Sequence, residues 1–171
     1  MYFEDVTAGQ VIEHRRARTV TEADNFRWTL ATLNTAQGHW NHEQAPPGKD
    51  GCLVNGTVVL AIAVGLSTED ISGESLGDVL LDKVRFRAPT FPNDTLHSRS
   101  EIIDLRDAER PDAGLIHYRI TATNQHGDVV VEAERHILVK RAAAWADRDR
   151  DRQRAVFGLG ATAHQEERET S

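Results

Sequence analysis

The segment NGTVVLAIAVGL, residues 55–66, decides the fold because its apolar residues follow one another almost without interruption. An element that is apolar nearly all round is expected to be buried rather than to lie on a surface. Because it also contains several β-branched residues, periodicity alone does not distinguish a buried helix from a buried strand. However, Ala61, Ala63 and Gly65 are small, and the strand-like segments that follow need a partner face. We therefore predict a buried central helix that begins at Asn55-Gly56-Thr57.

The segments after this helix, beyond a turn-rich stretch at residues 72–77, have the patterns of strands. Residues 79–88 alternate apolar and charged side chains until Pro89 and Pro92 interrupt them. Three more strands are predicted at residues 95–105, 115–123 and 129–139, and residues 124–128 are predicted to form a hairpin turn with Gly127 at positive φ. Four antiparallel strands that cover one face with a buried helix indicate a two-layer α+β domain.

The segments before the helix predict a strand, a helix and a long loop. Residues 11–20 are rich in β-branched residues and favour a strand with one solvent-exposed face. Thr21 followed by acidic residues is typical of a helix start, and Phe26, Leu30 and Leu33 continue with approximate helical spacing up to Asn34. Residues 35–51 lack periodicity and predict an irregular loop, which at this length is usually functional or disordered.

The bulk composition limits the classes of protein to consider. The 171 residues fit one domain, residues 1–141, followed by a charged tail, residues 142–171, that is helical or disordered. The net charge of -7 argues against a nucleic-acid partner. Cys52 is the single cysteine and is expected to be a small buried hydrophobe rather than a nucleophile. The start shows no targeting pattern and no apolar run could span a bilayer, so we expect a cytoplasmic protein without a membrane partner.

The polar stretch LNTAQGHWNHE, residues 33–43, is the candidate active-site segment because imidazoles, amides, a carboxylate and an indole are concentrated there. From the residues alone, a loop histidine satisfied by a backbone carbonyl is the favoured interpretation of His39. The spacing of His39, His42 and Glu43 is not that of an HExxH metal motif, so no metal is expected. Trp40 is expected to pack as core under the loop rather than to stack on a substrate.

Four pieces of the chain, in sequence order, resemble the MaoC-like dehydratases, the (R)-specific enoyl-CoA hydratase branch of the hot-dog fold. They cover residues 2–140 and are Phe3-Glu4-Asp5 with Ala8-Gly9, RTVTEAD at 18–24, KVRFRAPTFPNDTL at 83–96 and NQHGDVV at 124–130. The resemblance implies a single hot-dog domain, in which an antiparallel sheet wraps around a buried central helix.

The catalytic motif of this family runs Asp, any residue, Asn, Pro, aliphatic, His, any residue, Asp or Asn. His39 and Asn41 match its last two defined positions, whereas Asn34 stands at the position of the aspartate. The inner positions also differ, since they hold Ala36, Gln37 and Gly38. The resemblance implies that His39 is the acid/base, that Asn34 orients the water, and that Asn41 belongs to the substrate-binding set.

The His-Gly pair that the family has at the entrance to the buried helix is Asn55-Gly56 here. The resemblance implies that the Gly56 N–H stabilises the enolate oxygen, since a helix N-terminus is a positive end, and that Asn55 lines the substrate site. The implied activity is reversible hydration of an enoyl thioester, or dehydration of a 3-hydroxyacyl thioester, on CoA or a carrier protein, with no cofactor and no metal. The implied assembly is a homodimer, which would also remove an exposed sheet edge.

Asn34 leaves the base unassigned because an amide does not accept a proton near neutral pH. His42, Glu43 and Asp50 are candidate auxiliary bases from the same loop, and the alternative is that His39 acts alone on a substrate that is more acidic at Cα, such as a branched or dicarboxylic acyl-CoA. Two further functions stay open. These are thioester hydrolysis with water activated by Glu43 or Asp50, and an acyl-thioester-binding subunit whose site has decayed.

Lys83, Arg85 and Arg87 are candidate contacts for the phosphates of CoA, because they lie on one side of a predicted strand. It is equally consistent with the sequence that these three residues lie on a face of the strand that is exposed to solvent or takes part in an interface.

Overall fold

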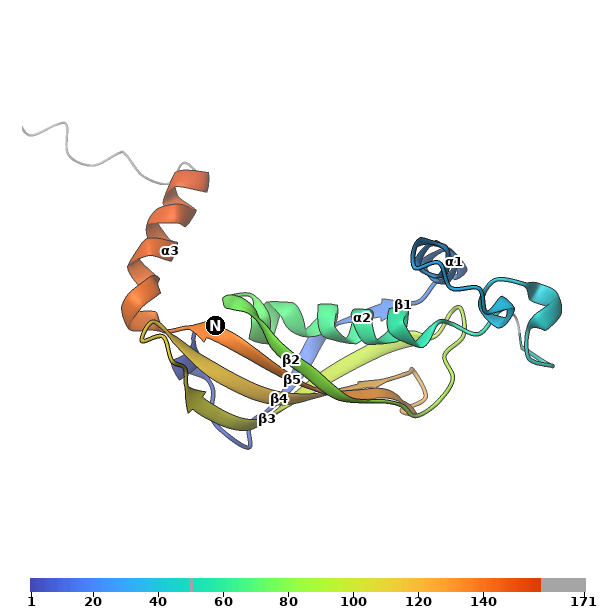
Figure 1. Ribbon diagram of the computed structural model, residues 1–171, viewed down its shortest axis with the longest axis horizontal. Coiled ribbons are helices and arrows are strands. Elements are labelled where there is room, and N and C mark those ends of the chain that lie inside the picture. The colour runs from blue at the N-terminus through green and yellow to red at the C-terminus, as the bar shows by residue number, and fades with distance from the viewer. Residues whose placement is uncertain (50, 158–171) are drawn as a thin grey trace, which may run out of the picture.

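The protein is described by a computed structural model, which places residues 1–49 and 51–157. Five strands form one antiparallel sheet in the order β1-β3-β4-β5-β2, so β1 and β2 are its edges. The strands are β1 (Val11–Thr19), β2 (Ser75–Phe86), β3 (Thr95–Asp107), β4 (Ala113–Thr123) and β5 (Val129–Lys140), and the α-helices are α1 (Glu22–Ala31), α2 (Gly56–Ser67) and α3 (Ala142–Phe157). Helix α2 lies along one face of the sheet, with α1 and α3 at opposite ends (Figure 1).

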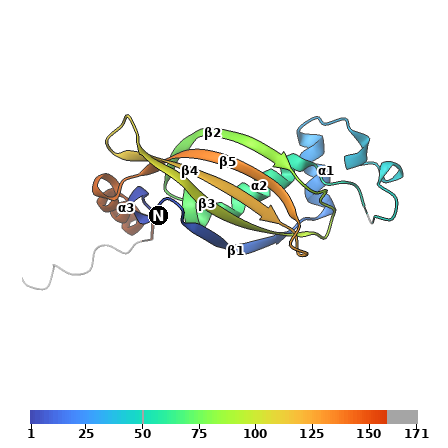
Figure 2. The same cartoon turned by 90° about the horizontal axis from the view of Figure 1, so that it is seen from below.

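Helix α2 packs one face on the sheet, as seen from the side of the strands in Figure 2. Its buried residues recur at helical spacing and meet buried side chains from β4 and β5 in one core that contains Val58, Val59, Ile62, Leu66, Ile116, Tyr118, Ile120, Ile137 and Val139. The predicted central helix is therefore present, but the expectation that it is buried all round is wrong. Thr57, Ala61 and Gly65, spaced by one turn, are exposed on its other face, because among the described residues no second layer covers that face.

Helix α1 starts where it was predicted to start. Thr21 Oγ1 accepts the Asp24 N–H at 3.2 Å, and Asp24 in turn accepts the Thr21 N–H at 2.9 Å, which is a capping box. The helix ends at Ala31 rather than at Asn34, since Leu33 has φ of 54° and so leaves the helical region.

The apolar spacing of α1 predicted the wrong buried face. Leu30 is 63% exposed and Leu33 is 86% exposed, whereas Asn25 and Thr29 are buried. The buried face of α1 meets loop backbone, whose N–H and C=O groups need polar partners. Apolar spacing does not detect that requirement.

The loop after α1 has more local order than its sequence indicated. Residues Gln37–His39 and His42–Gln44 form 3-10 turns. Trp40 is 38% exposed, so its predicted role as core is wrong. Cys52 is fully buried, as expected, and this burial raises the pKa of its thiol.

The strands β3, β4 and β5 are longer than predicted, whereas β1 ends one residue earlier and β2 both begins and ends earlier than predicted. β2 begins at Ser75 inside the predicted turn, because Ser75 already pairs with Val139 of β5. β2 contains several register shifts, and Lys83 has φ of 48° at one of them. The hairpin turn at residues 124–128 is confirmed, with Gly127 at φ of 85° and Asn124 Oδ1 accepting the Asp128 N–H at 2.9 Å.

The predicted tail begins as helix α3, which contacts the domain. Lys140 Nζ lies 2.7 Å from Asp149 Oδ1, and Trp145 Nε1 donates to the backbone oxygen of Asp112 at 3.1 Å. The rest of the tail, residues 158–171, lies outside the described residues. Within the described residues, no helix combines the length and the apolar character needed to cross a membrane.

Candidate active site

A cavity of about 430 Å³ opens at the N-terminal end of α2, within the range of roughly 300–1,000 Å³ typical of small-molecule sites. One wall is the start of α2 with the residues before it, and the other is the end of β2 with the loop that follows. The lining is mostly apolar, with a few polar groups, and consists of His39, Leu53, Val54, Asn55, Gly56, Thr57, Val59, Phe86, Arg87, Ala88, Pro89, Thr90 and Val130.

His39 is the imidazole of this cavity. It ends the 3-10 turn Gln37–His39 and is half-buried, and its Nδ1 lies 2.7 Å from the backbone oxygen of Leu53. Because a carbonyl only accepts, Nδ1 must carry the hydrogen, and Nε2 of the neutral ring is then the acceptor. No partner of Nε2 occurs among residues 1–49 and 51–157. The ring is therefore held in the tautomer that can take a proton at Nε2 and return it.

Gly56 also lines this cavity, and its backbone N–H lies at the start of α2. It is the first residue of α2, and Asn55 caps the helix by accepting the Thr57 N–H at 3.0 Å. In the part of the chain that the structure describes, the Gly56 N–H has no hydrogen-bond acceptor, as expected for a first-turn N–H at the positive end of a helix. A Cβ at Gly56 would lie 2.8 Å from Cε1 of Phe86, so glycine permits this close approach.

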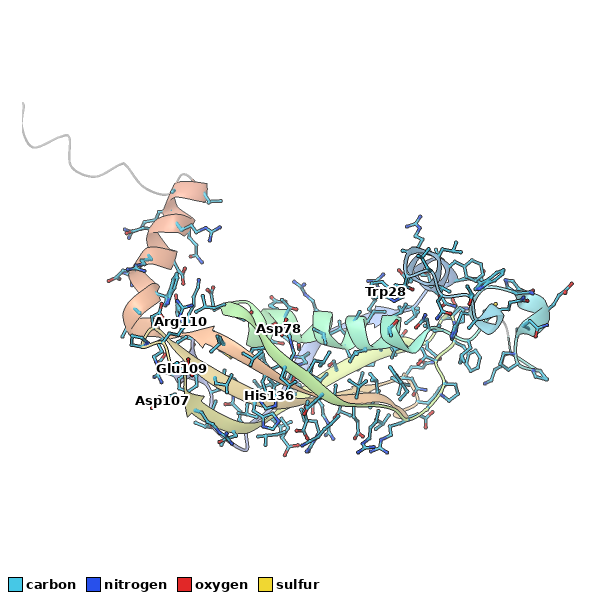
Figure 3. The ribbon with its side chains drawn as sticks, viewed as in Figure 1. Trp28, Asp78, Asp107, Glu109, Arg110 and His136 are labelled. Atoms are coloured by element: carbon cyan, nitrogen blue, oxygen red, sulfur yellow. The ribbon has the colours of Figure 1, made fainter. Side chains whose placement is uncertain are left out.

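A second contact joins α1 to the start of α2. Trp28 of α1 lies near this end of α2 (Figure 3), and its Nε1 donates to Thr57 Oγ1 at 2.8 Å. Thr57 Oγ1 donates in turn to Asn55 Oδ1 at 2.8 Å. The cap of α2 is therefore tied to α1 through an indole and a hydroxyl.

The other predicted catalytic residues do not line this cavity. Asn34 Oδ1 accepts the Ala36 N–H at 2.8 Å, and the Asn41 amide donates to Gln37 Oε1 at 2.8 Å. His42 pairs with Glu22 at 3.0 Å, and Glu43 is exposed. Asp50 lies outside the described residues.

Of the three basic residues suggested for CoA phosphates, Arg87 lines the cavity. Its Nε donates to Glu132 Oε2 at 2.6 Å. Lys83 instead pairs with Glu134 at 2.8 Å, and Arg85 is exposed. The left-handed backbone at Lys83 breaks the strand alternation on which the prediction of one shared face rested.

Sequence reasoning missed two polar residues of this region. Asn25 is fully buried beneath His39 and donates to its backbone oxygen at 2.8 Å. Thr90 lines the cavity, is buried, and has no hydrogen-bond partner for its Oγ1 among the described residues. The spacing of Asn25 and Thr29, one turn apart on a helix next to the polar loop, is the signal that could have indicated a polar buried face.

Comparison with known proteins agrees with the resemblance of the chain to the MaoC-like dehydratases. A family model described as mesaconyl-CoA hydratase matches residues 1–167. The β-methylmalyl-CoA dehydratase of Chloroflexus aurantiacus is 28% identical over 148 residues, which cover 82% of this chain and 40% of the relative. A mesaconyl-CoA hydratase of Cereibacter sphaeroides is 25% identical over 141 residues, covering 82% of this chain and 41% of the relative.

Among solved structures, a Mycobacterium tuberculosis protein with a double hot-dog fold superposes with a TM-score of 0.76 at 22% identity, over 85% of this chain and 46% of its own. This likeness confirms the predicted hot-dog fold. The chain thus spans about 40% of the length of the two relatives and corresponds to one hot-dog unit. Its sequence match and its fold lead to one conclusion: the chain belongs to the mesaconyl-CoA hydratase family of MaoC-like dehydratases.

Proposed function

We propose that this chain catalyses reversible addition of water to an enoyl-CoA thioester, with His39 as the acid/base. The observation that carries the proposal is that one cavity is lined both by His39, whose Nδ1 is engaged by Leu53, and by Gly56, whose N–H has no acceptor among the described residues. A hydratase needs a group that moves a proton and a donor for the enolate oxygen. These two groups supply both.

His39 can serve as the single acid/base, because the proton that it takes from water is the one that it returns to the substrate. Nε2 takes a proton from water while the water oxygen forms a bond to Cβ, and the electron pair of the double bond moves toward the thioester oxygen. The Gly56 N–H stabilises the resulting enolate. The protonated ring then returns the proton to Cα, so that OH has added at Cβ and H at Cα. Dehydration is the reverse sequence.

The described lining of the cavity contains no carboxylate, which supports the single-base route over a route with an Asp base. Such a route suits a substrate with an acidic Cα. The relatives are named for mesaconyl-CoA and β-methylmalyl-CoA, whose acyl groups carry one free carboxylate besides the thioester. Arg87 is the cation in the lining and is the group that would attract such a carboxylate. We therefore propose a branched dicarboxylic acyl-CoA as the substrate class.

We also propose that two copies of the chain associate through β2. This edge strand exposes several large apolar side chains, namely Val79, Leu80, Leu81, Val84 and Phe86, and a long apolar edge strand is a ready surface for pairing with another strand. Sedimentation equilibrium should give twice the mass of the chain, and a monomer at micromolar concentration would contradict the proposal.

The single buried cysteine accords with a reducing, cytoplasmic location.

The activity is tested with His39→Ala on a panel that includes crotonyl-CoA and mesaconyl-CoA, with product detected as the mass change of one water. We expect turnover to fall by about 10²–10⁴-fold, the usual contribution of an acid/base group. His126→Ala, at an exposed histidine of the β4–β5 turn that does not line the cavity, is the matched control and should retain activity.

Other outcomes would identify the alternatives. Unchanged turnover in His39→Ala would overturn the assignment. Release of free thiol without loss of enoyl absorbance would indicate a thioesterase, and tight acyl-CoA binding without turnover would indicate a binding subunit.

A further inference from the structure

We propose that Asn25 is a positioning residue, which holds both the imidazole of His39 and the start of α2 through one side-chain amide. Asn25 lies on the buried face of α1 and has no exposed surface. The kinetic consequence of this inference rests on the proposed hydratase activity, whereas its structural consequence does not.

The amide of Asn25 uses its full hydrogen-bonding capacity. Nδ2 donates to the backbone oxygens of His39, at 2.8 Å, and Leu53, at 3.1 Å. Oδ1 accepts the backbone N–H of Asn55 at 2.9 Å and the hydroxyl of Thr29 at 3.5 Å. Two carbonyls on one side and an N–H on the other define which end of the amide is nitrogen.

The orientation of His39 depends on this amide through the carbonyl of Leu53. That oxygen accepts from His39 Nδ1 at 2.7 Å and from Asn25 Nδ2 at 3.1 Å, so both of its lone pairs are engaged. The Leu53 N–H donates to Gly38 O at 3.1 Å, which joins the same two segments again. Asn25 therefore fixes the peptide of His39 and the acceptor of its ring at the same time.

The position of the Gly56 N–H depends on the other end of the amide. Asn25 Oδ1 holds the backbone N–H of Asn55, the residue that caps α2, and Gly56 is the next residue in the chain. The distance between the proton-transfer group and the oxyanion donor is thereby set by the dimensions of one side chain. Displacements of about 1 Å cost on the order of 10²-fold in rate, so a shared anchor matters for the reaction.

Replacing the amide of Asn25 by a carboxylate distinguishes the positioning role from simple packing, because the two groups have the same size but differ in their hydrogen-bond donors. Asn25→Asp keeps the volume and the oxygen that accepts from Asn55, but an ionised carboxylate has no N–H for His39 O and Leu53 O. It would repel the Leu53 carbonyl and so release the ring of His39. Thr29→Val is the matched control, since Thr29 is equally buried on the same helix and contacts the network only through the long 3.5 Å bond.

The experiment combines nitrogen-15 NMR of the His39 ring, assigned by its loss in His39→Ala, with kcat and KM for mesaconyl-CoA. We expect wild type and Thr29→Val to show the tautomer with hydrogen on Nδ1. We expect Asn25→Asp to lose that preference and to lower kcat by about 10²-fold with a smaller change in KM. If Asn25→Asp does not fold, the same spectra are recorded for Asn25→Ser, which keeps one donor and should give a smaller loss of the Nδ1–H form.

The two readouts separate the proposals from one another. An unchanged His39 tautomer in a folded Asn25 variant would overturn the positioning role, as would an equal loss in Thr29→Val. If wild type hydrates no thioester while the Asn25 variants still change the tautomer, the proposed activity fails and the positioning role stands.

Discussion

The cavity at the start of α2 and the sheet face opposite α2 both contain a histidine held by hydrogen bonds, but their partners differ in charge. At the cavity, the ring and the backbone of His39 form hydrogen bonds with backbone carbonyls and with the amide of Asn25. On the sheet face, Glu134 accepts from Lys83, His117 and Arg119, and His117 stacks on His136 with ring centroids 3.9 Å apart. His136 is marked on the sheet in Figure 3.

The hydrogen bonds at the cavity position a side chain, whereas those on the sheet face pair opposite charges. Burial alone would raise the pKa of Glu134, but the hydrogen bonds from its three partners outweigh burial and hold the pKa at about 2. The negative charge is therefore permanent at neutral pH and stabilises the fold. The partners of His39 at the cavity are uncharged, so they orient the ring without pairing it with a carboxylate.

The largest expected effect concerns the backbone donor of the cavity. Gly56→Pro removes the N–H, and proline is tolerated at the first position of a helix. Gly56→Ala is the matched control, because both variants place a Cβ against the ring of Phe86 and alanine keeps the N–H. Loss of one oxyanion donor costs about 10²–10³-fold in kcat, so Gly56→Pro should be slower than Gly56→Ala by that factor. Equal rates in enoyl-CoA hydration would remove Gly56 from the reaction.

The fold was more predictable from the sequence than the site was. Alternation in the strands and the Asn124–Asp128 turn are local patterns, and the structure confirms them. His39 and Gly56 were predicted because each occupies a position in a motif, and both line the same cavity. Asn25 was missed because its role comes from contacts with residues 14, 28 and 30 positions away in the chain, and periodicity carries no information about such contacts. The bulge at Lys83 was missed for a similar reason, since register depends on the neighbouring strand.

A smaller effect is expected for the charged face. Glu134→Gln removes a carboxylate whose pKa falls from 4.5 to about 2 on folding. That shift corresponds to about 3 kcal/mol, and because Lys83 and Arg119 are partly exposed, we expect a loss of about 1–2 kcal/mol in unfolding free energy at pH 7. A lowered pKa stabilises above the unfolded value, so the contribution should be lost as pH falls from 4.5 toward 2.

Urea unfolding of wild type and Glu134→Gln at pH 7 and at pH 3 measures this effect. The difference between the two proteins should shrink at the lower pH. Glu101→Gln is the control, because the Glu101–Arg119 pair is exposed on both sides and should contribute less than about 1 kcal/mol. A Glu134→Gln difference that is the same at both pH values would show that its carboxylate is not the source of the stability.

The smallest effect is expected at Asn34, although its position in the motif suggests the largest. Asn34 does not line the cavity, and its Oδ1 accepts the Ala36 N–H, which an aspartate would also do. Asn34→Asp should therefore change kcat for mesaconyl-CoA by less than about tenfold, whereas a newly acquired general base would raise it by about 10²–10⁴-fold. A rise of the larger size would mean that residue 34 reaches the reacting water. The uncharged surroundings of His39 would then reflect the loss of a catalytic carboxylate rather than the arrangement with which the site works.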